Sequence, residues 1–410
     1  MSDASTTSKT VIIAGGGQAG FSCASKLREF GFEGRIVMVA EESQAPYQRP
    51  PLSKTYMTGE MTLERILLRP NSFYEEKSIE LLNDTLIDSI DTDQQTATLS
   101  NGDVLSYDKL VLATGARPRT LPEAIGGELN GVLTMRTLND ADRMAPELKE
   151  GRRLLVIGGG YIGLEAAAVA RKLGLDVTVV EAADRILKRV ASPETSNYFR
   201  DLHVKNGVTI LEDTALECLL EKDGHVAGAK LQNGDEIAAD IAIVGIGVLP
   251  NQEIAEAAGI TVDNGIVVNE HGETNNANIY AIGDCASILH KDTRIRLESV
   301  GHAIDHAILV AKNICGQSET YLAKPWFWSD QYATKLQIAG LNLGYDDVVI
   351  RELGEGSQSI WYFSGDTLLA VDAMNAPRDY LVSKRMIEAG KSPSKAEVSD
   401  PNTDLKALLK

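Results

Sequence analysis

The feature that most constrains how this 410-residue chain can fold is a glycine-rich turn that occurs twice. Each copy, VIIAGGGQAG and LLVIGGGYIG, stands between an apolar run and an apolar helical pattern. The glycines in the G-x-G-x-x-G register are Gly15, Gly17 and Gly20 in the first copy and Gly158, Gly160 and Gly163 in the second. In this pattern the first glycine permits a sharp turn, the second lets a pyrophosphate approach, and the third lets the helix pack on the sheet. The N–H groups at the start of the helix favour phosphate.

Each glycine turn opens a predicted strand–helix–strand segment, which implies parallel strands joined by a right-handed crossover. The second strands end in IVMVA and VTVV, and an acidic residue follows each of them. It is Glu41 or Glu42 in the first segment and Glu181 in the second. A carboxylate at this place can accept the ribose 2′-hydroxyl of a dinucleotide. A glycine-rich turn alone is weak evidence for nucleotide binding, because it is often only a turn. The strands, the spacing and the carboxylates together predict two dinucleotide-binding sites.

A second pattern follows each of these segments. Short alternating runs with the turn signals Asn101-Gly102 and Asn233-Gly234 predict a small antiparallel meander in each half. From about Lys324 the sequence pattern changes to alternating strands with a closing helix around Arg378–Ala389. We expect the last ten or so residues to be loosely held. The predicted fold class is α/β, with two Rossmann-like dinucleotide-binding domains plus a C-terminal α+β domain.

The segment NNANIYAIGDCAS indicates which dinucleotide belongs to which half. It ends an extended run at Gly283-Asp284, just before a possible helix start. An aspartate there can bind the ribityl chain of a flavin, with the helix N-terminus facing the polar edge of the ring; the alternative is that Asp284 is a plain N-cap. We therefore predict an FAD-binding domain over 1–120 and 248–323, an NAD-binding domain over 121–247, and the third domain over 324–410.

Composition excludes several other functions. The net charge of −18 argues against nucleic acid, whose phosphates favour a basic surface. No apolar run approaches the roughly 20 residues of a membrane helix, and the polar N-terminus does not resemble a secretory signal. The four cysteines form no C-x-x-C or ferredoxin-type spacing, which predicts reduced thiols, no metal site and no iron–sulfur cluster in this chain. We expect a cytoplasmic protein.

With these motifs the chain resembles the FAD-dependent pyridine-nucleotide reductases, and more narrowly the ferredoxin reductases of bacterial oxygenase systems, of the putidaredoxin reductase kind. The segments PYQRPPLSK and PWFWSDQY are specific to this subgroup, while the glycine motifs are shared by the wider superfamily. The resemblance implies that NADH passes electrons through FAD to a [2Fe-2S] ferredoxin, which supplies a P450 or a ring-hydroxylating dioxygenase. It also implies that hydride passes directly to the flavin, without a protein nucleophile or general base.

The resemblance carries site residues onto this sequence, and it favours Glu41 over Glu42. The residues expected at FAD are Gly15, Gly17, Ala19, Gly20, Glu41, Arg49, Lys54, Ile87, Ala113, Thr114, Gly115, Arg136, Gly283, Asp284, Val300 and Trp328. The residues expected at NAD are Gly158, Gly160, Tyr161, Ile162, Gly163, Glu181, Gly245, Ile246 and Gly247. The residues expected to take part in catalysis are Lys54, Glu165 and Trp328.

Four of these residues, Lys54, Glu165, Trp328 and Glu181, have more than one interpretation. Lys54 is expected to stabilise negative charge on the reduced flavin while Glu165 holds it in place; otherwise the two are unrelated surface charges. Trp328 is expected to flank the flavin and to lie between it and the docked partner; otherwise it is a core aromatic residue. Glu181 favours NADH because it repels a 2′-phosphate, but Arg185 is close enough in sequence to reach that site.

An acidic ferredoxin would be repelled by an acidic chain unless basic residues gather where it docks. The candidates for such a docking surface are Arg65, Arg69, Lys335, Arg378 and Arg385, and the alternative is that these are ordinary solvated charges. The resemblance is compatible with a monomer or weak dimer.

Competing functions within the same superfamily stay open. A disulfide reductase needs a cysteine pair beside the flavin, and an NADH oxidase or peroxidase needs one cysteine where YQRPPLSK stands. Rubredoxin- or nitrite-reductase-type NADH reductases are a further alternative. A redox signalling protein like apoptosis-inducing factor would bind other macromolecules instead of turning over rapidly.

Overall fold

The computed structural model describes residues 9–409, which form two compact units. The first unit contains the N-terminal segment through Gln48, then Thr62–Arg117 and Leu249–Lys324. The second unit contains Arg49–Met61, Pro118–Val248 and everything from Pro325 onward. The short strands β8 (Ala116–Pro118) and β17 (Val248–Pro250) stand where the chain passes between the units.

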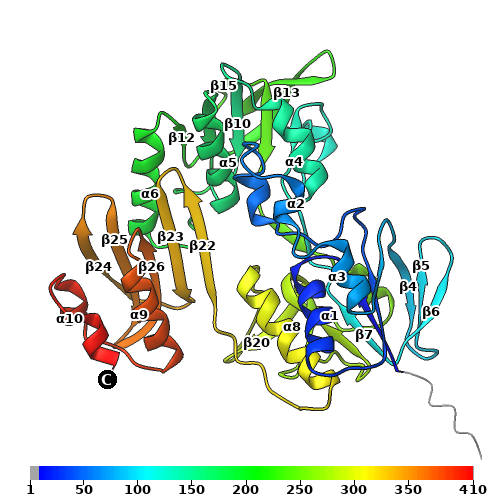
Figure 1. Ribbon diagram of the computed structural model, residues 1–410. Helices are drawn as coiled ribbons and strands as arrows, with labels where there is room; N and C mark the ends of the chain where they lie inside the picture. The colour runs from blue at the N-terminus through cyan, green and yellow to red at the C-terminus, as the bar shows by residue number, and fades with distance from the viewer. Residues whose placement is uncertain (1–8, 410) are drawn as a thin grey trace, which may run out of the picture. The chain divides into compact units, whose positions relative to one another are not determined.

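The first unit is built on a parallel sheet in the order β19-β7-β1-β2-β3. Its strands are β1 (Thr10–Ala14), β2 (Arg35–Val39), β3 (Ile79–Leu82), β7 (Lys109–Leu112) and β19 (Ile279–Ala281). Helices α1 (Gln18–Glu29) and α8 (Val300–Ile314) lie side by side in this unit (Figure 1). Their apolar faces share one buried core with the sheet, as expected for parallel strands covered by helices.

Smaller elements complete the first unit. The predicted meander is the antiparallel sheet β4 (Ile87–Asp91), β5 (Thr96–Leu99) and β6 (Val104–Ser106), with Asn101-Gly102 in the turn between its last two strands. The remaining elements are α2 (Leu63–Ile66), α3 (Asn71–Glu76), α7 (Glu253–Ala257), η4 (Gly283–Cys285), β18 (Ile266–Val267), β20 (Ala286–His290) and β21 (Thr293–Ile295).

The second unit repeats the design with the parallel sheet β12-β11-β10-β16-β9. Its strands are β9 (Val132–Leu133), β10 (Arg153–Ile157), β11 (Asp176–Val180), β12 (Thr209–Leu211) and β16 (Ile241–Val244). Its helices are α4 (Leu138–Met144), α5 (Tyr161–Lys172) and α6 (Pro193–Lys205), with η1 (Pro50–Ser53), η2 (Glu123–Ile125) and η3 (Ala145–Glu147). The second predicted meander is present as β13 (Leu216–Lys222), β14 (His225–Leu231) and β15 (Glu236–Ala238).

The C-terminal part of the second unit is an antiparallel sheet in the order β22-β23-β26-β25-β24. Its strands are β22 (Trp326–Gln331), β23 (Thr334–Gly340), β24 (Asp347–Gly354), β25 (Ser357–Ser364) and β26 (Thr367–Met374). Helix α9 (Pro377–Glu388) matches the predicted closing helix closely, and α10 (Lys395–Ser399) and η5 (Leu405–Leu409) follow it. The parallel and antiparallel sheets confirm the predicted α/β class with a C-terminal α+β part, whereas the three domain boundaries stay a prediction.

The expectation of a loosely held C-terminus is wrong for residues 401–409; Lys410 lies outside the described residues. The buried guanidinium of Arg351 donates to the carbonyl oxygens of Pro401 and Thr403, both at 2.9 Å. Leu405 is buried in the core of the C-terminal sheet. No sequence pattern predicts these hydrogen bonds, because they join one charged side chain to backbone atoms some 50 residues away. Within residues 9–409, no helix combines the length and apolar character that crossing a membrane requires.

A buried carboxyl group joins α6 to the C-terminal sheet. Asp372 accepts hydrogen bonds from the hydroxyls of Thr195, at 2.7 Å, and of Tyr362. Burial raises the pKa of Asp372 from 3.8 to about 6, against the opposing effect of the two hydroxyl donors. The folded state therefore holds a proton on Asp372 at pH values where the unfolded chain has lost it.

This pKa shift predicts that Asp372 makes folding less favourable as pH rises. Its contribution to stability is fully present below about pH 4 and is lost as pH rises through about 6, by on the order of 2–3 kcal/mol. We expect Asp372→Asn to raise the melting temperature at pH 7 but to have little effect at pH 4. The exposed Asp366→Asn in the turn before β26 is the control and should shift neither value. An equal effect of Asp372→Asn at both pH values would show that Asp372 keeps its ordinary pKa.

Candidate functional site

The glycine turn of the first unit is tightly packed except at its middle glycine. A Cβ atom on Gly15 would lie 2.2 Å from the carbonyl oxygen of Ala113, and one on Gly20 would lie 2.0 Å from that of Gly15. Side chains are therefore excluded at both places, because the turn touches β7 and α1 touches the turn. A Cβ on Gly17 would meet nothing within 4 Å.

The second unit shows the same arrangement. A Cβ on Gly158 would lie 2.5 Å from the carbonyl oxygen of Gly245, and one on Gly163 would lie 2.2 Å from that of Gly158. A Cβ on Gly160 would again meet nothing within 4 Å. In both units the outer glycines serve internal packing, and the space beside the middle glycine is open.

The helices that follow are ready to bind an anion. Gly17 is the N-cap of α1 and Gly160 that of α5, and no described side chain caps either helix start. Their first N–H groups therefore have partial positive charge with no side-chain acceptor. Open space beside the middle glycine and uncapped N–H groups together fit the pyrophosphate of a dinucleotide in each unit.

The predicted FAD residues of the first unit converge on one edge of its sheet. The loop after β7 is held by Asn251, whose carbonyl oxygen accepts from the Thr114 hydroxyl at 2.6 Å and whose side-chain amide donates to the Thr114 carbonyl at 2.9 Å. A Cβ on Gly283 would lie 2.9 Å from Cβ of Ala19, so η4 contacts the start of α1. Strands β1, β7 and β19 end here, which is where open parallel sheets bind their ligands.

The predicted helix start at Gly283-Asp284 is only partly correct. The structure has the short 3₁₀ turn η4 there, with Ile282 as its N-cap, and strand β20 follows directly. The next α-helix, α8, begins at Val300 and packs against η4, so two predicted FAD residues, Asp284 and Val300, lie on adjacent elements. Ile87, another, begins β4 and is half-buried.

Glu41 and Glu181, the two acidic residues expected at the riboses, do not occupy equivalent positions relative to their glycine turns. Gly15 N donates to the Val39 carbonyl, as Gly158 N does to the Val180 carbonyl, so the structural equivalent of Glu181 is Ala40. Glu41 is therefore one position further along, where it is exposed. The neighbouring Glu42 accepts a hydrogen bond from the Tyr47 hydroxyl. This contact supports the choice of Glu41 for the ribose, which stays a prediction.

Glu181 lies across the glycine turn of the second unit. Its carboxylate accepts from Gly159 N at 2.7 Å and from Ala183 N at 2.8 Å. Arg185 points away toward the start of α6, where its guanidinium donates to Ser196 Oγ and to the Ala191 carbonyl. Arg185 is thus already hydrogen-bonded to other oxygen atoms. This weakens the case that it binds the 2′-phosphate of NADPH.

We expect Glu181→Ala to erode the preference for NADH over NADPH by about ten- to a hundredfold in kcat/KM, because a charged hydrogen bond to the ribose is lost and repulsion of a 2′-phosphate disappears. The ratio of the two kcat/KM values measures this. The matched control is Glu236→Ala, an exposed acidic residue of β15 in the same unit. An unchanged ratio would remove Glu181 from the ribose site.

The ion pair of Lys54 and Glu165 is present within the second unit. Lys54 Nζ donates to Glu165 Oε2 at 2.8 Å, and their side chains are 18% and 7% exposed. The alternative of two unrelated surface charges is therefore wrong. Pro50 and Pro51 begin η1, where fixed φ angles favour the turn, and Lys54 is its C-cap; Glu165 lies in the second turn of α5.

The carboxylate of Glu165 has further donors that the sequence interpretation missed. Ser53 Oγ donates to Oε2 at 3.1 Å, and Ser329 Oγ donates to Oε1 at 2.7 Å. A buried carboxylate is tolerated when it is paired and hydrogen-bonded in this way. Ser53 lies inside PYQRPPLSK and Ser329 inside PWFWSDQY, so both donors belong to the two motifs that mark the subgroup.

Aromatic side chains stand directly before Ser329 in the sequence. Trp326 and Trp328 stack on one face of β22, with ring centroids 5.5 Å apart and planes at 21°. Phe327 points to the other face of β22, where its ring centroid lies 5.2 Å from that of Tyr161 of α5. Both tryptophans are only half-buried, so Trp328 is no ordinary core residue. Ile162, the next residue of α5, is 46% exposed beside the uncapped helix start.

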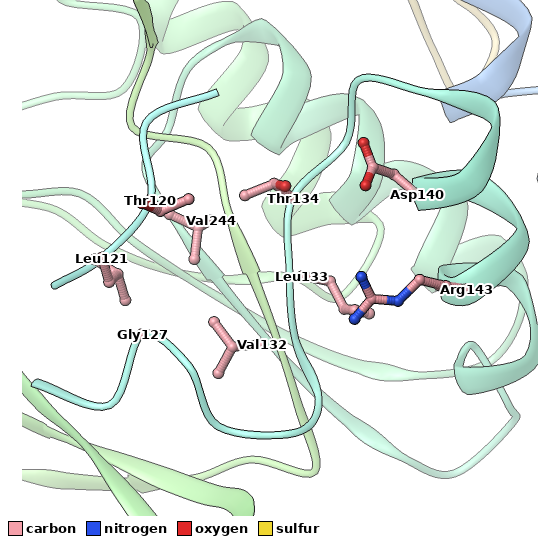
Figure 2. Close-up of a pocket in the computed structure, with 9 residues that line it drawn as sticks. All are labelled: Thr120, Leu121, Gly127, Val132, Leu133, Thr134, Asp140, Arg143 and Val244. Atoms are coloured by element: carbon pink, nitrogen blue, oxygen red, sulfur yellow. The ribbon is translucent and has the colours of Figure 1, made fainter. Parts of the chain in front are cut away.

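Arg49 and Arg136, also expected at FAD, are joined within the second unit. Arg49 Nη1 donates to the Arg136 carbonyl oxygen at 2.7 Å, and Arg136 N donates to Asp140 Oδ2 at 3.0 Å. Asp140 also caps α4 through Thr137. A cavity of about 100 Å³ lies beside this cap (Figure 2). Its lining is Thr120, Leu121, Gly127, Val132, Leu133, Thr134, Asp140, Arg143 and Val244, and it is too small for a dinucleotide.

The two buried cysteines, Cys23 and Cys285, are unsuited to nucleophilic chemistry. All four cysteines are free, and Cys23 and Cys285 are fully buried. Burial raises the pKa of both thiols, which disfavours the reactive thiolate. This argues against the disulfide reductase and NADH peroxidase alternatives.

The basic docking candidates divide between the units. Arg65 and Arg69 belong to the first unit, and Lys335, Arg378 and Arg385 belong to the second. All five are exposed, and none forms an ion pair with an acidic side chain of the described residues. Their charge is available to a partner, but a role in docking stays a prediction.

Comparisons with known proteins cover nearly the whole chain. Residues 9–307 match the family described as pyridine nucleotide-disulphide oxidoreductase, and residues 326–409 match the reductase C-terminal family. Rhodocoxin reductase of Rhodococcus erythropolis is 43% identical over 403 residues, covering 98% of this chain and 94% of that protein. A ferredoxin–NAD(P)(+) reductase of a Sphingomonas species is 41% identical over 404 residues, covering 97% of each.

Among solved structures, the fold is similar to that of the reductase in the covalent putidaredoxin reductase–putidaredoxin complex. The TM-score is 0.95, the sequences are 40% identical, and the match covers 98% of each chain.

Proposed function

Because the chain belongs to the pyridine nucleotide-disulphide oxidoreductase family, we propose that it is a flavoprotein reductase that passes electrons from NADH through FAD to a [2Fe-2S] ferredoxin of an oxygenase system. The overall reaction converts one NADH and two oxidised ferredoxins into NAD⁺, two reduced ferredoxins and one proton. The observation that carries the proposal is the pair of matching glycine turns, each with open space at its middle glycine.

Bound FAD would supply the chemistry, because it accepts an electron pair as hydride and releases the electrons singly. The residues of the first unit that fit FAD are those at the edge of the β19-β7-β1 sheet, around Gly17, Thr114 and Asp284. The residues that fit NADH lie around Gly160 and Glu181. The protein's own contribution is to bind and orient the two nucleotides.

Lys54 would place a positive charge beside the flavin, where reduction adds negative charge. Its ammonium is held at 2.8 Å by Glu165, whose carboxylate is itself held by two serine hydroxyls. An oriented charge in a site shielded from water stabilises developing charge far more than one in water. Trp328 would present an aromatic surface between the flavin and the partner.

The partner assignment is supported by the names of the relatives, which include a ferredoxin–NAD(P)(+) reductase, and by the solved putidaredoxin complex. We propose that Arg65, Arg69, Lys335, Arg378 and Arg385 offset the repulsion between an acidic ferredoxin and a chain with a net charge of −18. Basic residues in this role raise the association rate and make it depend on salt.

The test is NADH-dependent reduction of a panel of carriers by the purified holoprotein. We expect rapid reduction of a [2Fe-2S] ferredoxin, a KM for ferredoxin that rises with salt, and slow reduction of oxygen. Arg378→Glu with Arg385→Glu should raise that KM about tenfold while ferricyanide reduction is unchanged; Lys222→Glu, an exposed lysine of β13, is the control. Faster reduction of rubredoxin, or rapid NADH consumption with oxygen alone, would contradict the proposal.

A further inference from the structure

A chain of buried polar side chains starts at Glu165 and continues well beyond it. Ser329, which donates to Glu165, accepts a hydrogen bond from Gln331 Nε2 at 3.1 Å. Gln331 Oε1 lies 2.7 Å from His203 Nε2, and His203 Nδ1 lies 3.3 Å from the Tyr332 hydroxyl. These four links join α5, β22, α6 and the turn after β22 within the second unit.

Every link in this chain is oriented in the same direction. Burial lowers the pKa of His203, so its ring is neutral at pH 7. A neutral ring has one donor and one acceptor nitrogen. Because Gln331 donates from its nitrogen to Ser329, its oxygen accepts from His203 Nε2–H, and Nδ1 is left to accept from Tyr332. All donors therefore point toward Glu165, and aligned hydrogen bonds of this kind strengthen one another.

The interior members of the chain are well shielded from solvent. Ser329, Gln331 and His203 are each fully buried. Polar side chains are rarely placed in a protein interior unless their hydrogen bonds are satisfied, and a network that is fully satisfied is rigid. Each of these three side chains uses the hydrogen bonds described above, so each depends on its neighbour in the chain.

The outer end of the chain has an unusual backbone. Tyr332 has a φ of +53°, in the left-handed region that bulky residues seldom adopt and glycine adopts easily. It occupies the first position of the two-residue turn Tyr332–Ala333 between β22 and β23. A strained residue at such a place is retained when its side chain has a role, and here the hydroxyl reaches His203.

We propose that Tyr332, His203, Gln331 and Ser329 are positioning residues that fix the Glu165 carboxylate and, through it, the ammonium of Lys54. This inference rests on the proposed function, since it takes Lys54 to lie beside the flavin. The chain supplies Glu165 Oε1 with an oriented donor while Lys54 binds Oε2. Losing that donor leaves the negative charge of Glu165 less compensated, which disfavours the extra electrons of the reduced flavin.

The experiment measures the flavin midpoint potential and the rate of flavin reduction by NADH in the holoprotein. For Ser329→Ala and Gln331→Met we expect a more negative potential and reduction that is three- to tenfold slower. The matched control is Ser359→Ala, another fully buried serine of the same unit, whose hydroxyl contacts Asp379 and Trp361. It should cost stability without moving the potential.

Two variants of Tyr332 separate this role from effects on folding. Tyr332→Phe removes only the hydroxyl, whereas Tyr332→Gly also relieves the left-handed strain. We expect both to shift the potential in the same negative direction by similar, smaller amounts, although Tyr332→Gly also loses the ring that packs against His203 and should be the less stable protein. The inference would be overturned if the change in midpoint potential scaled with the loss of stability of the two variants instead of being similar in both.

Lys54→Met distinguishes failure of this inference from failure of the proposed function. Suppose that Lys54→Met moves the potential to more negative values, while Ser329→Ala and Gln331→Met leave it unchanged or make it more positive. The positioning role of the hydrogen-bonded side chains is then refuted, and the placement of Lys54 stands. If Lys54→Met leaves the potential unchanged, Lys54 does not lie beside the flavin, and both its proposed placement and the positioning role of the hydrogen-bonded side chains are refuted.

Discussion

Replacing Lys54 with methionine is expected to slow the reduction of bound flavin by NADH about a hundredfold, the size of effect seen when one oriented donor is removed from a catalytic site. Methionine keeps an unbranched side chain, one atom shorter than that of lysine, and removes the charge. The change also leaves Glu165 buried with only its serine donors, Ser53 and Ser329. The protein should therefore lose stability as well as speed. Rapid mixing with NADH under anaerobic conditions measures the rate.

The double variant Lys54→Met/Glu165→Gln separates those two effects. It removes the unpaired buried charge, so we expect its melting temperature to recover while its flavin reduction stays slow. The matched control is Lys172→Met, which breaks an exposed ion pair with Glu60 between α5 and the same 49–61 segment. Normal reduction by Lys54→Met, or recovery of the rate in the double variant, would rule out a direct electrostatic role for Lys54.

The second large effect is expected at the middle glycines. Gly17 and Gly160 have φ angles of −86° and −80°, which any residue can adopt, and a Cβ at either would meet nothing within 4 Å. Valine at these positions should therefore preserve the fold and obstruct only a nucleotide. We expect Gly17→Val to purify folded but without FAD. We expect Gly160→Val to keep its FAD and to raise the KM for NADH at least tenfold.

The outer glycines provide the contrast. Alanine at Gly20 or Gly163 would place its Cβ 2.0 or 2.2 Å from a backbone oxygen, so both variants should be destabilised whether or not a nucleotide is bound. Flavin content and the melting temperature together distinguish the two classes. Loss of flavin from Gly160→Val, with flavin kept by Gly17→Val, would reverse the assignment of the two sites.

The sequence predicted best what depends on neighbouring residues. The two glycine turns, their strands and the Asn-Gly turns of both meanders are local patterns, and the structure contains all of them. The ion pair of Lys54 and Glu165 spans 111 residues, and it was predicted only through the family resemblance. Periodicity and spacing contain no information about such a contact.

The features that sequence reasoning missed depend on tertiary packing. Gln331 and His203 meet across 128 residues, and neither residue type marks a site by itself. The offset between Glu41 and Glu181 appears only in the hydrogen bonds that align the two glycine turns. The short 3₁₀ turn at Asp284 replaces the predicted helix, because β20 begins at the next residue after Cys285 and pairs with both β18 and β21.

The most direct test of the account is an anaerobic titration of the purified protein with NADH, followed in the visible absorption of flavin. We expect a yellow protein with one tightly held FAD per chain, which bleaches fully with one equivalent of NADH and regains its colour on addition of oxidised [2Fe-2S] ferredoxin. A colourless protein, or a flavin that NADH does not bleach, would contradict the central claim that this chain holds FAD in one unit and receives NADH in the other.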